Sequence, residues 1–215
     1  MKLDFPHSAL ILVDLQYDFC TGGALQVENG EAVIDPLNHL AALFSDRYGR
    51  VVATQDWHPA NHASFASSYA NRSPGETVDL SKVKDQVLWP DHCVQGSHGA
   101  AFHERLDTRP VSFIVRKGFR SDLDSYSSFY ENDRKTSTGL DGLLKALSIT
   151  NLVLGGLATD YCVFYSAMDA VALGYNTYVV NDAVKGVNVP SGSIEKALKF
   201  MDKAGVTFVV SEDIQ

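Results

Sequence analysis

The sequence predicts an α/β fold in which an open, mostly parallel sheet carries helices on both faces. Short apolar runs alternate along the chain with longer segments of helical periodicity, which is the pattern of consecutive βα units. The short runs are continuously apolar rather than alternating, as is typical of strands that are buried on both faces. At 215 residues, the chain is expected to form a single domain, residues 1–215.

Six strands are expected, each indicated by a run of β-branched and other apolar residues. The first run ends at Asp14, the second leads into a polar Asp-Trp-His segment, and the third ends at Lys117. The fourth leads into a pair of glycines. The predicted strands are Ala9–Val13, Arg50–Thr54, Val111–Arg116, Asn151–Leu154, Asn176–Val180 and Val206–Val210.

Four helices are expected between these strands, at about Glu31–Tyr48, Gly139–Leu147, Asp160–Leu173 and Ser193–Ala204. The third begins with Thr159 and Asp160, residue types that cap helix N-termini, and ends at Gly174, which suits a C-cap. The segment from Pro59 to Trp89 shows little periodicity. A loop of this length in a small domain is usually functional or disordered, and the tryptophan, proline and histidine at its end favour an ordered, functional loop.

Composition excludes several classes of function. The net charge of −8 and the pI near 5.2 argue against nucleic-acid binding, which needs clustered basic residues. The apolar run Ala9–Val13 is too short for a signal peptide or a membrane span. Three cysteines, Cys20, Cys93 and Cys162, are too few and too odd in number for a disulfide framework, so a reducing, cytoplasmic setting is expected.

Chemically versatile residues follow four of the predicted strands. Asp14 follows the first, Asp56 and His58 follow the second, Lys117 ends the third and Cys162 comes shortly after the fourth. Open α/β sheets bind ligands outside the carboxyl ends of their strands, so these side chains are expected to converge. Each residue alone has an ordinary structural explanation, but their joint placement predicts an active site.

Cys162 is the candidate nucleophile because it lies in the first turn of a predicted helix, where the amides and the helix dipole favour a thiolate. Residues 155–160, before it, are expected to form a tight strand-to-helix turn whose amides can point at one spot, as an oxyanion hole requires. Asp14 is the candidate base, and Lys117 would hold both in their charged forms. The structural alternatives are a small buried residue for Cys162, a helix cap or a surface ion pair for Asp14, and a salt bridge for Lys117. Cys20 and Cys93 lack this setting.

A metal site is predicted beside these residues. Asp56 and His58 follow a strand, and His92 lies at the end of the long loop. One carboxylate and two imidazoles suit zinc, iron or manganese and leave coordination positions open. A D-x-H pair is a weak signal by itself. His62 and Asp91 are further donors nearby.

Aromatic residues near these groups are candidates for the walls of a slot that holds a flat ring. Phe19, Trp89 and Tyr126 each lie within a few residues of a proposed site group. Phe119 and Phe129 compete for the same role. Because aromatic side chains are more often core than pocket, this prediction depends on their neighbours.

Taken together, these motifs resemble those of the nicotinamidases, within the isochorismatase-like cysteine hydrolase superfamily, nearly end to end. The first and last of the matching blocks are shared across the superfamily, whereas the Asp-Trp-His and Trp-Pro-x-His-Cys blocks are similar to nicotinamidases specifically. The blocks are Val13 to Gly23, Thr54 to Pro59, Trp89 to Cys93, Lys117-Gly118 and Gly155 to Val163.

The resemblance implies a role for each candidate residue. It matches Asp14, Lys117 and Cys162 to a catalytic triad, and it matches Asp56, His58 and His92 to metal ligands. A cis peptide between Leu157 and Ala158 would turn the amides of Ala158 and Cys162 toward an oxyanion. Phe19 and Trp89 match ring-packing positions, Tyr126 does so less closely, and His62 matches a ligand in only part of the family.

The fold implied is the three-layer isochorismatase-like sandwich. The activity implied is hydrolysis of nicotinamide to nicotinic acid and ammonia through a thioester, with one divalent metal ion, zinc first, and with pyrazinamide also accepted. Nicotinamide is then the expected partner, with no nucleic acid or membrane, and a homo-oligomer is left open. The alternatives are another superfamily hydrolase, acting on isochorismate or a different small amide, and a non-catalytic binding protein, which would show a broken triad.

Overall fold

Six parallel strands form the central sheet in the computed structural model, which describes residues 1–215. The strand order is β5-β2-β1-β6-β7-β8, and every neighbouring pair is parallel. The strands are β1 (Ser8–Val13), β2 (Arg50–Asp56), β5 (Phe113–Lys117), β6 (Asn151–Leu157), β7 (Asn176–Lys185) and β8 (Thr207–Val209). All six strands predicted from the sequence are present, and β6 and β7 extend further than expected.

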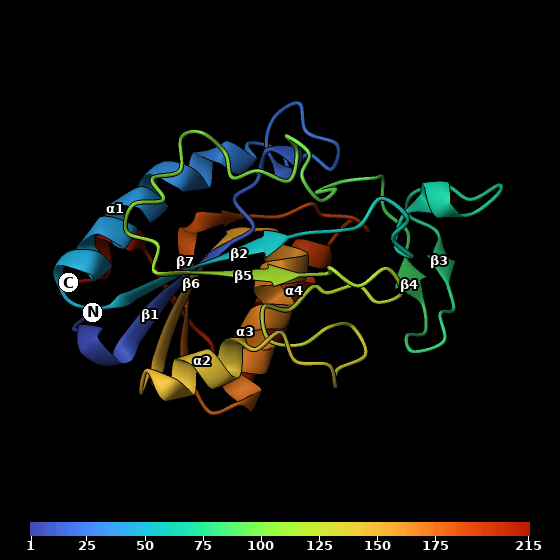
Figure 1. Ribbon diagram of the computed structural model, residues 1–215. Helices are drawn as coiled ribbons and strands as arrows, with labels where there is room; N and C mark the ends of the chain where they lie inside the picture. Colours follow the sequence, from blue (N-terminus) through green and yellow to red (C-terminus); the bar gives the residue numbers. More distant parts are fainter.

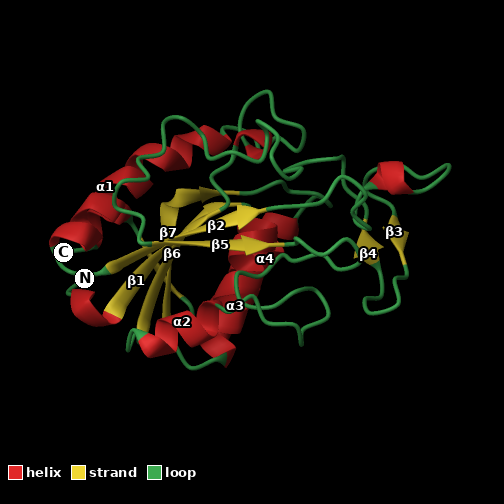
Figure 2. Cartoon of the chain, viewed as in Figure 1, coloured by secondary structure: helices red, strands yellow, loops and turns green.

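Helices cover both faces of this sheet, as the sequence predicts (Figures 1 and 2). One face carries α1 (Ile34–Asp46), and the other carries α2 (Leu140–Ala146), α3 (Phe164–Ala172) and α4 (Ser193–Ala204). Strand β1 serves both layers because successive side chains point to opposite faces. Leu10 and Leu12 pack in the core beneath α1, whereas Ile11 packs with the other three helices.

The first helix and the third strand begin later than expected. The first helix is preceded by a 3₁₀ turn, Gly30–Val33, so its α-helical part begins three residues later than predicted. The third strand begins at Phe113 rather than Val111, and its side chains alternate between half-buried and exposed. This strand lies at the edge of the sheet with one neighbour, which explains why Ile114 is 54% exposed.

The helix after β6 begins differently from the prediction. Residues Thr159–Val163 form a π-helical turn before α3, and no side chain caps its start. Asp160 instead accepts hydrogen bonds from the backbone N–H groups of Val187 and Asn188, at 2.9 and 2.8 Å. The predicted N-cap is therefore wrong, because this carboxylate is buried against another loop. Gly174 does follow the helix with a positive φ of 90°, as expected of a C-terminal glycine.

The first part of the segment between β2 and β5 lies beyond the carboxyl ends of the strands, and its last part returns past α1 to the start of β5 (Figure 1). It contains a 3₁₀ turn, Ala66–Ser68, and a small antiparallel pair, β3 (Thr77–Val78) with β4 (Gln86–Val87). The long segment predicted from the sequence as an ordered loop thus has short elements of its own. No helix of the chain combines the length and the apolar character needed to cross a membrane.

The strand order creates a topological switch point between β1 and β6. From β1 the chain moves outward through β2 to β5, then returns to β6 on the other side of β1 and continues to β8. Adjacent crossovers therefore leave in opposite directions, which opens a crevice at the carboxyl ends of these two strands. Asp14 follows β1 directly, and Cys162 follows β6 after one short turn.

Candidate active site

Lys117 lies at the centre of a buried polar cluster at this crevice. It is the last residue of β5, and its side chain is fully buried. Its Nζ lies 2.9 Å from Asp14 Oδ2, 2.5 Å from Asp56 Oδ1 and 3.5 Å from Cys162 Sγ. It also donates a hydrogen bond to the carbonyl oxygen of Ser125 at 3.1 Å. The acid, lysine and cysteine that the sequence predicted to converge are thus brought together.

The carboxylate of Asp14 is oriented by Thr54, its neighbour on β2. The Thr54 hydroxyl donates to Asp14 Oδ1 at 2.6 Å and accepts a hydrogen bond from the Asp14 backbone N–H at 3.1 Å. Oδ2 forms the ion pair with Lys117 but has no directed hydrogen bond. Asp14 Oδ2 is consequently free to accept a proton, and its carboxylate and Cys162 Sγ lie within 4.8 Å of each other.

The charge balance of this cluster differs from the sequence-based expectation. Burial raises the pKa of the Cys162 thiol well above its usual value. Lys117 opposes this rise, but Asp14 and Asp56 reinforce it. Burial likewise raises the pKa of Asp14. Lys117 thus favours the ionised forms of both groups, as expected, but burial outweighs it and the neighbouring carboxylates add to the rise at Cys162, so that both pKa values lie above their usual values.

Three side chains with metal-ligand chemistry lie beside this cluster. Asp56 Oδ2 is 3.5 Å from His58 Nε2 and 3.8 Å from His92 Nε2, and the ligand atoms of all three residues lie within 4.8 Å of one another. Burial alone would raise the pKa of Asp56, but Lys117 and His58 outweigh it and hold that pKa well below its usual range. The carboxylate is thus ionised and available as a ligand.

Both imidazoles are oriented by backbone carbonyls. His58 Nδ1 lies 2.8 Å from the carbonyl oxygen of Gly118, and His92 Nδ1 lies 2.8 Å from that of Pro90. A carbonyl oxygen can only accept, so each Nδ1 carries a proton, and in the neutral ring the lone pair is then on Nε2, on the side of Asp56. His58 Nε2 is buried without any hydrogen-bond partner. A polar atom left unpaired in this way is expected where an ion completes the site.

Glycine is required at position 118 for the contact between the carbonyl oxygen of this residue and His58 Nδ1. Its φ is +61°, and a Cβ atom there would lie 2.4 Å from His58 Cε1. Glycine adopts this conformation without steric cost and lets the backbone approach the ring. The Lys117-Gly118 pair therefore combines the buried ammonium with the carbonyl that orients His58.

The two additional donors considered from the sequence do not join the group formed by Asp56, His58 and His92. His62 forms a separate group with His58 and Asp124, and both of its ring nitrogens are engaged, Nδ1 with Ser64 Oγ at 2.7 Å and Nε2 with the Leu123 carbonyl at 3.3 Å. Asp91 is exposed and accepts a hydrogen bond from a serine hydroxyl.

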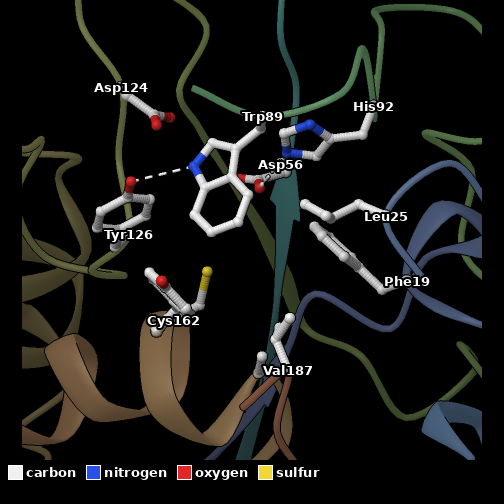
Figure 3. A pocket seen from close by; sticks show the side chains of 11 residues that line it. Phe19, Leu25, Asp56, Trp89, His92, Asp124, Tyr126, Cys162 and Val187 are labelled. Atoms are coloured by element: carbon white, nitrogen blue, oxygen red, sulfur yellow. Dashed lines mark hydrogen bonds and ion pairs between the residues drawn. The ribbon is translucent and has the colours of Figure 1, made fainter. Parts of the chain in front are cut away.

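One pocket is lined both by Cys162 and by the metal-ligand candidates Asp56 and His92 (Figure 3). Its empty volume is about 400 Å³, which includes space open to solvent. The three aromatic residues predicted to wall it, Phe19, Trp89 and Tyr126, all line it. Trp89 Nε1 donates a hydrogen bond to the Tyr126 hydroxyl at 3.1 Å, which fixes the two rings relative to each other (Figure 3). The competing candidates lie elsewhere, since Phe119 is 42% exposed and Phe129 is fully buried in the core.

Four residues that line the pocket had not been identified from the sequence, namely Leu25, Asp124, Tyr161 and Val187. Tyr161 was detectable, because it directly precedes Cys162. The other three lie in irregular segments without any motif. Ala158 and Cys162, the residues of the predicted oxyanion hole, both line the pocket, and the expected cis peptide between Leu157 and Ala158 is present.

Comparisons with known proteins agree with this geometry. The isochorismatase-domain family matches residues 8–213. A nicotinamidase from Escherichia coli (strain K12) is 43% identical over 210 residues, covering 97% of each chain. The structure of a nicotinamidase and pyrazinamidase from Acinetobacter baumanii is 45% identical, with a TM-score of 0.92, over 97% of this chain and 98% of the other. A Pyrococcus horikoshii pyrazinamidase solved in complex with zinc is 34% identical, with a TM-score of 0.79, over 95% of this chain and 99% of the other.

Proposed function

The chain belongs to the isochorismatase family, and on this premise we propose that it is a metal-dependent nicotinamidase, hydrolysing nicotinamide to nicotinic acid and ammonia. One observation carries the proposal. Cys162, which contacts Lys117, and Asp56 and His92, which form a potential metal site with His58, line the same pocket, which has aromatic walls. A flat ring that carries both a basic nitrogen and a carboxamide has a partner for each part.

The residues present fit a divalent metal ion. The carboxylate and the two Nε2 atoms converge, both imidazoles are held by their Nδ1 protons, and His58 Nε2 has no other partner. Two imidazoles and one carboxylate suit zinc, with iron and manganese as alternatives. The zinc complex of the Pyrococcus pyrazinamidase supports this choice. Such an ion would bind the pyridine nitrogen, fix the ring and withdraw electron density from it.

The first half of the proposed reaction is acylation of Cys162. Asp14 Oδ2 takes the proton of the Cys162 thiol as the sulfur attacks the carboxamide carbon. The amides of Ala158 and Cys162 stabilise the oxyanion that forms. Asp14 then returns the proton to the departing nitrogen, which leaves as ammonia, and a thioester remains on Cys162.

The second half is hydrolysis of this thioester. Asp14 removes a proton from a water molecule, and the resulting nucleophile attacks the thioester carbon. The carbon–sulfur bond then breaks to release the acid, and Asp14 returns the proton to the Cys162 sulfur. Lys117 stabilises the ionised forms of Asp14 and Cys162 as they arise, since its ammonium lies within 3.5 Å of both. Phe19, Trp89 and Tyr126 hold the ring between them. Pyrazinamide, with a similar ring, is expected to be a second substrate.

The test is ammonia release by the purified protein from nicotinamide and from benzamide, which keeps the carboxamide but lacks the ring nitrogen. We expect turnover of nicotinamide, loss of that turnover with a chelator, and much slower turnover of benzamide. His92→Ala should lower the metal content, measured by mass spectrometry, and reduce the preference for nicotinamide. His39→Ala, on an exposed histidine, is the control. Equal hydrolysis of both amides by a metal-free protein would instead indicate another hydrolase of this family.

A further inference from the structure

Tyr161 stands between the substrate pocket and two grooves on the surface. It lines the pocket that contains Cys162, and it also lines both grooves. The first, here called the polar groove, is lined in part by Lys84, Asn132 and Arg134. The second, here called the apolar groove, is lined in part by Phe164, Pro190 and Phe200. A single side chain thus borders all three spaces.

The side chain of Tyr161 is held in this position from several sides. Its hydroxyl donates a hydrogen bond to the carbonyl oxygen of Val189 at 2.6 Å. Its ring packs edge to face against Trp89, with the centroids 4.9 Å apart, and against Tyr126 at 5.4 Å. The loop that carries Val189 is itself tied to Asp160, the preceding residue, by hydrogen bonds from Val187 and Asn188. These contacts make the ring a fixed wall.

We propose that Tyr161 is a specificity-determining residue whose ring closes the pocket on the side of the grooves. An aromatic carboxamide with an unsubstituted ring places no substituent against this side of the pocket, whereas a bulky substituent that points toward Tyr161 meets the wall. Removing the ring would join the pocket to the grooves and admit such substituents. The part of this inference that concerns amide turnover rests on the proposed function.

Access to Cys162 tests the wall without reference to any substrate. Alkylation of Cys162 by iodoacetamide and by the bulkier N-phenyliodoacetamide is followed by mass spectrometry, which separates it from Cys20 and Cys93. In Tyr161→Ala the rate for the bulky reagent relative to the small one should rise about tenfold or more, as pocket walls commonly discriminate by this amount. Tyr165→Ala is the matched control, since Tyr165 lines both grooves but not the pocket.

Tyr161→Leu, which retains an apolar side chain but shortens the wall, is measured alongside in case the alanine variant does not fold. A folded Tyr161 variant with an unchanged ratio of rates would overturn the proposal. An equal rise in Tyr165→Ala would also overturn it, because the effect would then come from the grooves alone.

Substrate selection is tested with nicotinamides that carry a phenyl group at ring carbon 5 or 6. The kcat/KM of at least one of them, relative to nicotinamide, should rise about tenfold in the Tyr161 variants and stay near wild type in Tyr165→Ala. No change in this ratio, despite easier alkylation, would refute a role in specificity. If the wild-type protein hydrolyses no nicotinamide at all, the proposed function fails, while the alkylation experiment still decides the position of the wall.

Discussion

At the residue scale, Lys117 dominates the electrostatics of the site because its single positive charge is shared by two carboxylates and a thiol. All of these groups are buried, so the Coulomb interactions are strong and so is the cost of leaving any charge unpaired. Burial is the largest cause of the raised pKa of Cys162, and the two carboxylates add to it while Lys117 opposes it. A cation held at Asp56 would offset one of the two negative charges, which couples the proposed metal site to the reactivity of the thiol.

Replacing Cys162 tests the proposed nucleophile. Cys162→Ala should leave a folded protein with essentially no amidase activity, because no other thiol lies beside both a base and a cation. Cys20→Ala and Cys93→Ala should keep most of the turnover, since both thiols are buried in the core beneath α1. The measurements are ammonia release and thermal unfolding. Near-normal turnover by Cys162→Ala would remove this residue from the mechanism.

Replacing Lys117 should affect both stability and reactivity. Lys117→Ala leaves two buried carboxylates without their cation, a change that typically costs about 3–5 kcal/mol in the free energy of unfolding. It should also raise the thiol pKa further, which shifts the alkylation of Cys162 to higher pH, and reduce turnover by at least about 100-fold. The measurements are urea unfolding, alkylation rate against pH and ammonia release.

Lys145→Ala is the control for this variant. Lys145 pairs with Asp141 at 2.8 Å on the surface of α2, where its side chain is 61% exposed, so its loss should cost less than about 1 kcal/mol. Comparable losses in the two variants would mean that the buried cluster contributes little to stability.

The sequence was most informative about residues that follow strands. Asp14, Asp56 and Lys117 could be placed together because parallel strands end at one edge of a sheet. Leu25 and Val187 could not, since they lie in irregular loops whose path depends on tertiary contacts such as those of Asp160. The protonation state of Cys162 was also out of reach, because it depends on burial and on the number of nearby carboxylates.

At the scale of elements, the strands were predicted better than the way the helices begin. A continuous apolar run identifies a buried strand by itself, whereas a helix start depends on competing hydrogen bonds. Asp160 has the chemistry of an N-cap, but its carboxylate is bound by the loop at Val187 and Asn188. The short pair β3 and β4 was missed because two-residue strands leave no periodicity to detect.

The end of β5 gives a prediction about backbone approach. Gly118→Ala should push the His58 ring aside, because the new Cβ would lie 2.4 Å from its Cε1 and the residue has a φ of +61°. We expect a lower metal content, measured by mass spectrometry after dialysis against a fixed zinc concentration, and a lower melting temperature. A variant that binds metal as well as the wild type would show that His58 is not held through this carbonyl.

Gly142→Ala is the matched control for this substitution. Gly142 lies within α2, has no atom within 4 Å of a built Cβ, and has no positive φ. Alanine is favoured over glycine in a helix, so this variant should be more stable by roughly 0.5–1 kcal/mol and should keep its metal. The same chemical change thus has opposite expected effects at the two positions.

At the scale of the whole molecule, the order of the strands decides which residues meet. The sequence predicted six strands and a parallel sheet but not the order of the strands. That order depends on which strands hydrogen-bond to each other, and these can lie far apart in the sequence. Placing β6 beside β1 brings Cys162 to Asp14. The chain ends lie side by side at the opposite end of the sheet from the pocket (Figure 1), where the Gln215 backbone N–H bonds to the Met1 carbonyl.

A buried carboxyl outside the catalytic cluster links overall stability to pH. Glu131 is fully buried; Arg120 pairs with Oε1 at 3.2 Å, while Oε2 has no partner. Burial raises the pKa of Glu131 from 4.5 to about 7, with Arg120 opposing the rise. The native state therefore holds this proton more tightly than the unfolded chain does. Its contribution to stability is complete below about pH 4.5 and is lost as the pH rises through about 7.

Glu131→Gln mimics the protonated side chain and cannot lose that proton. Relative to wild type, its free energy of unfolding should therefore increase by about 1–3 kcal/mol between pH 5 and pH 8. Urea unfolding of both proteins at the two pH values measures this difference, in which the pH dependence of all shared groups cancels. Glu28→Gln, on an exposed side chain, should follow the wild type at both. A difference between Glu131→Gln and wild type that is constant with pH would show that Glu131 is already ionised in the folded protein near pH 5, held so by its pair with Arg120.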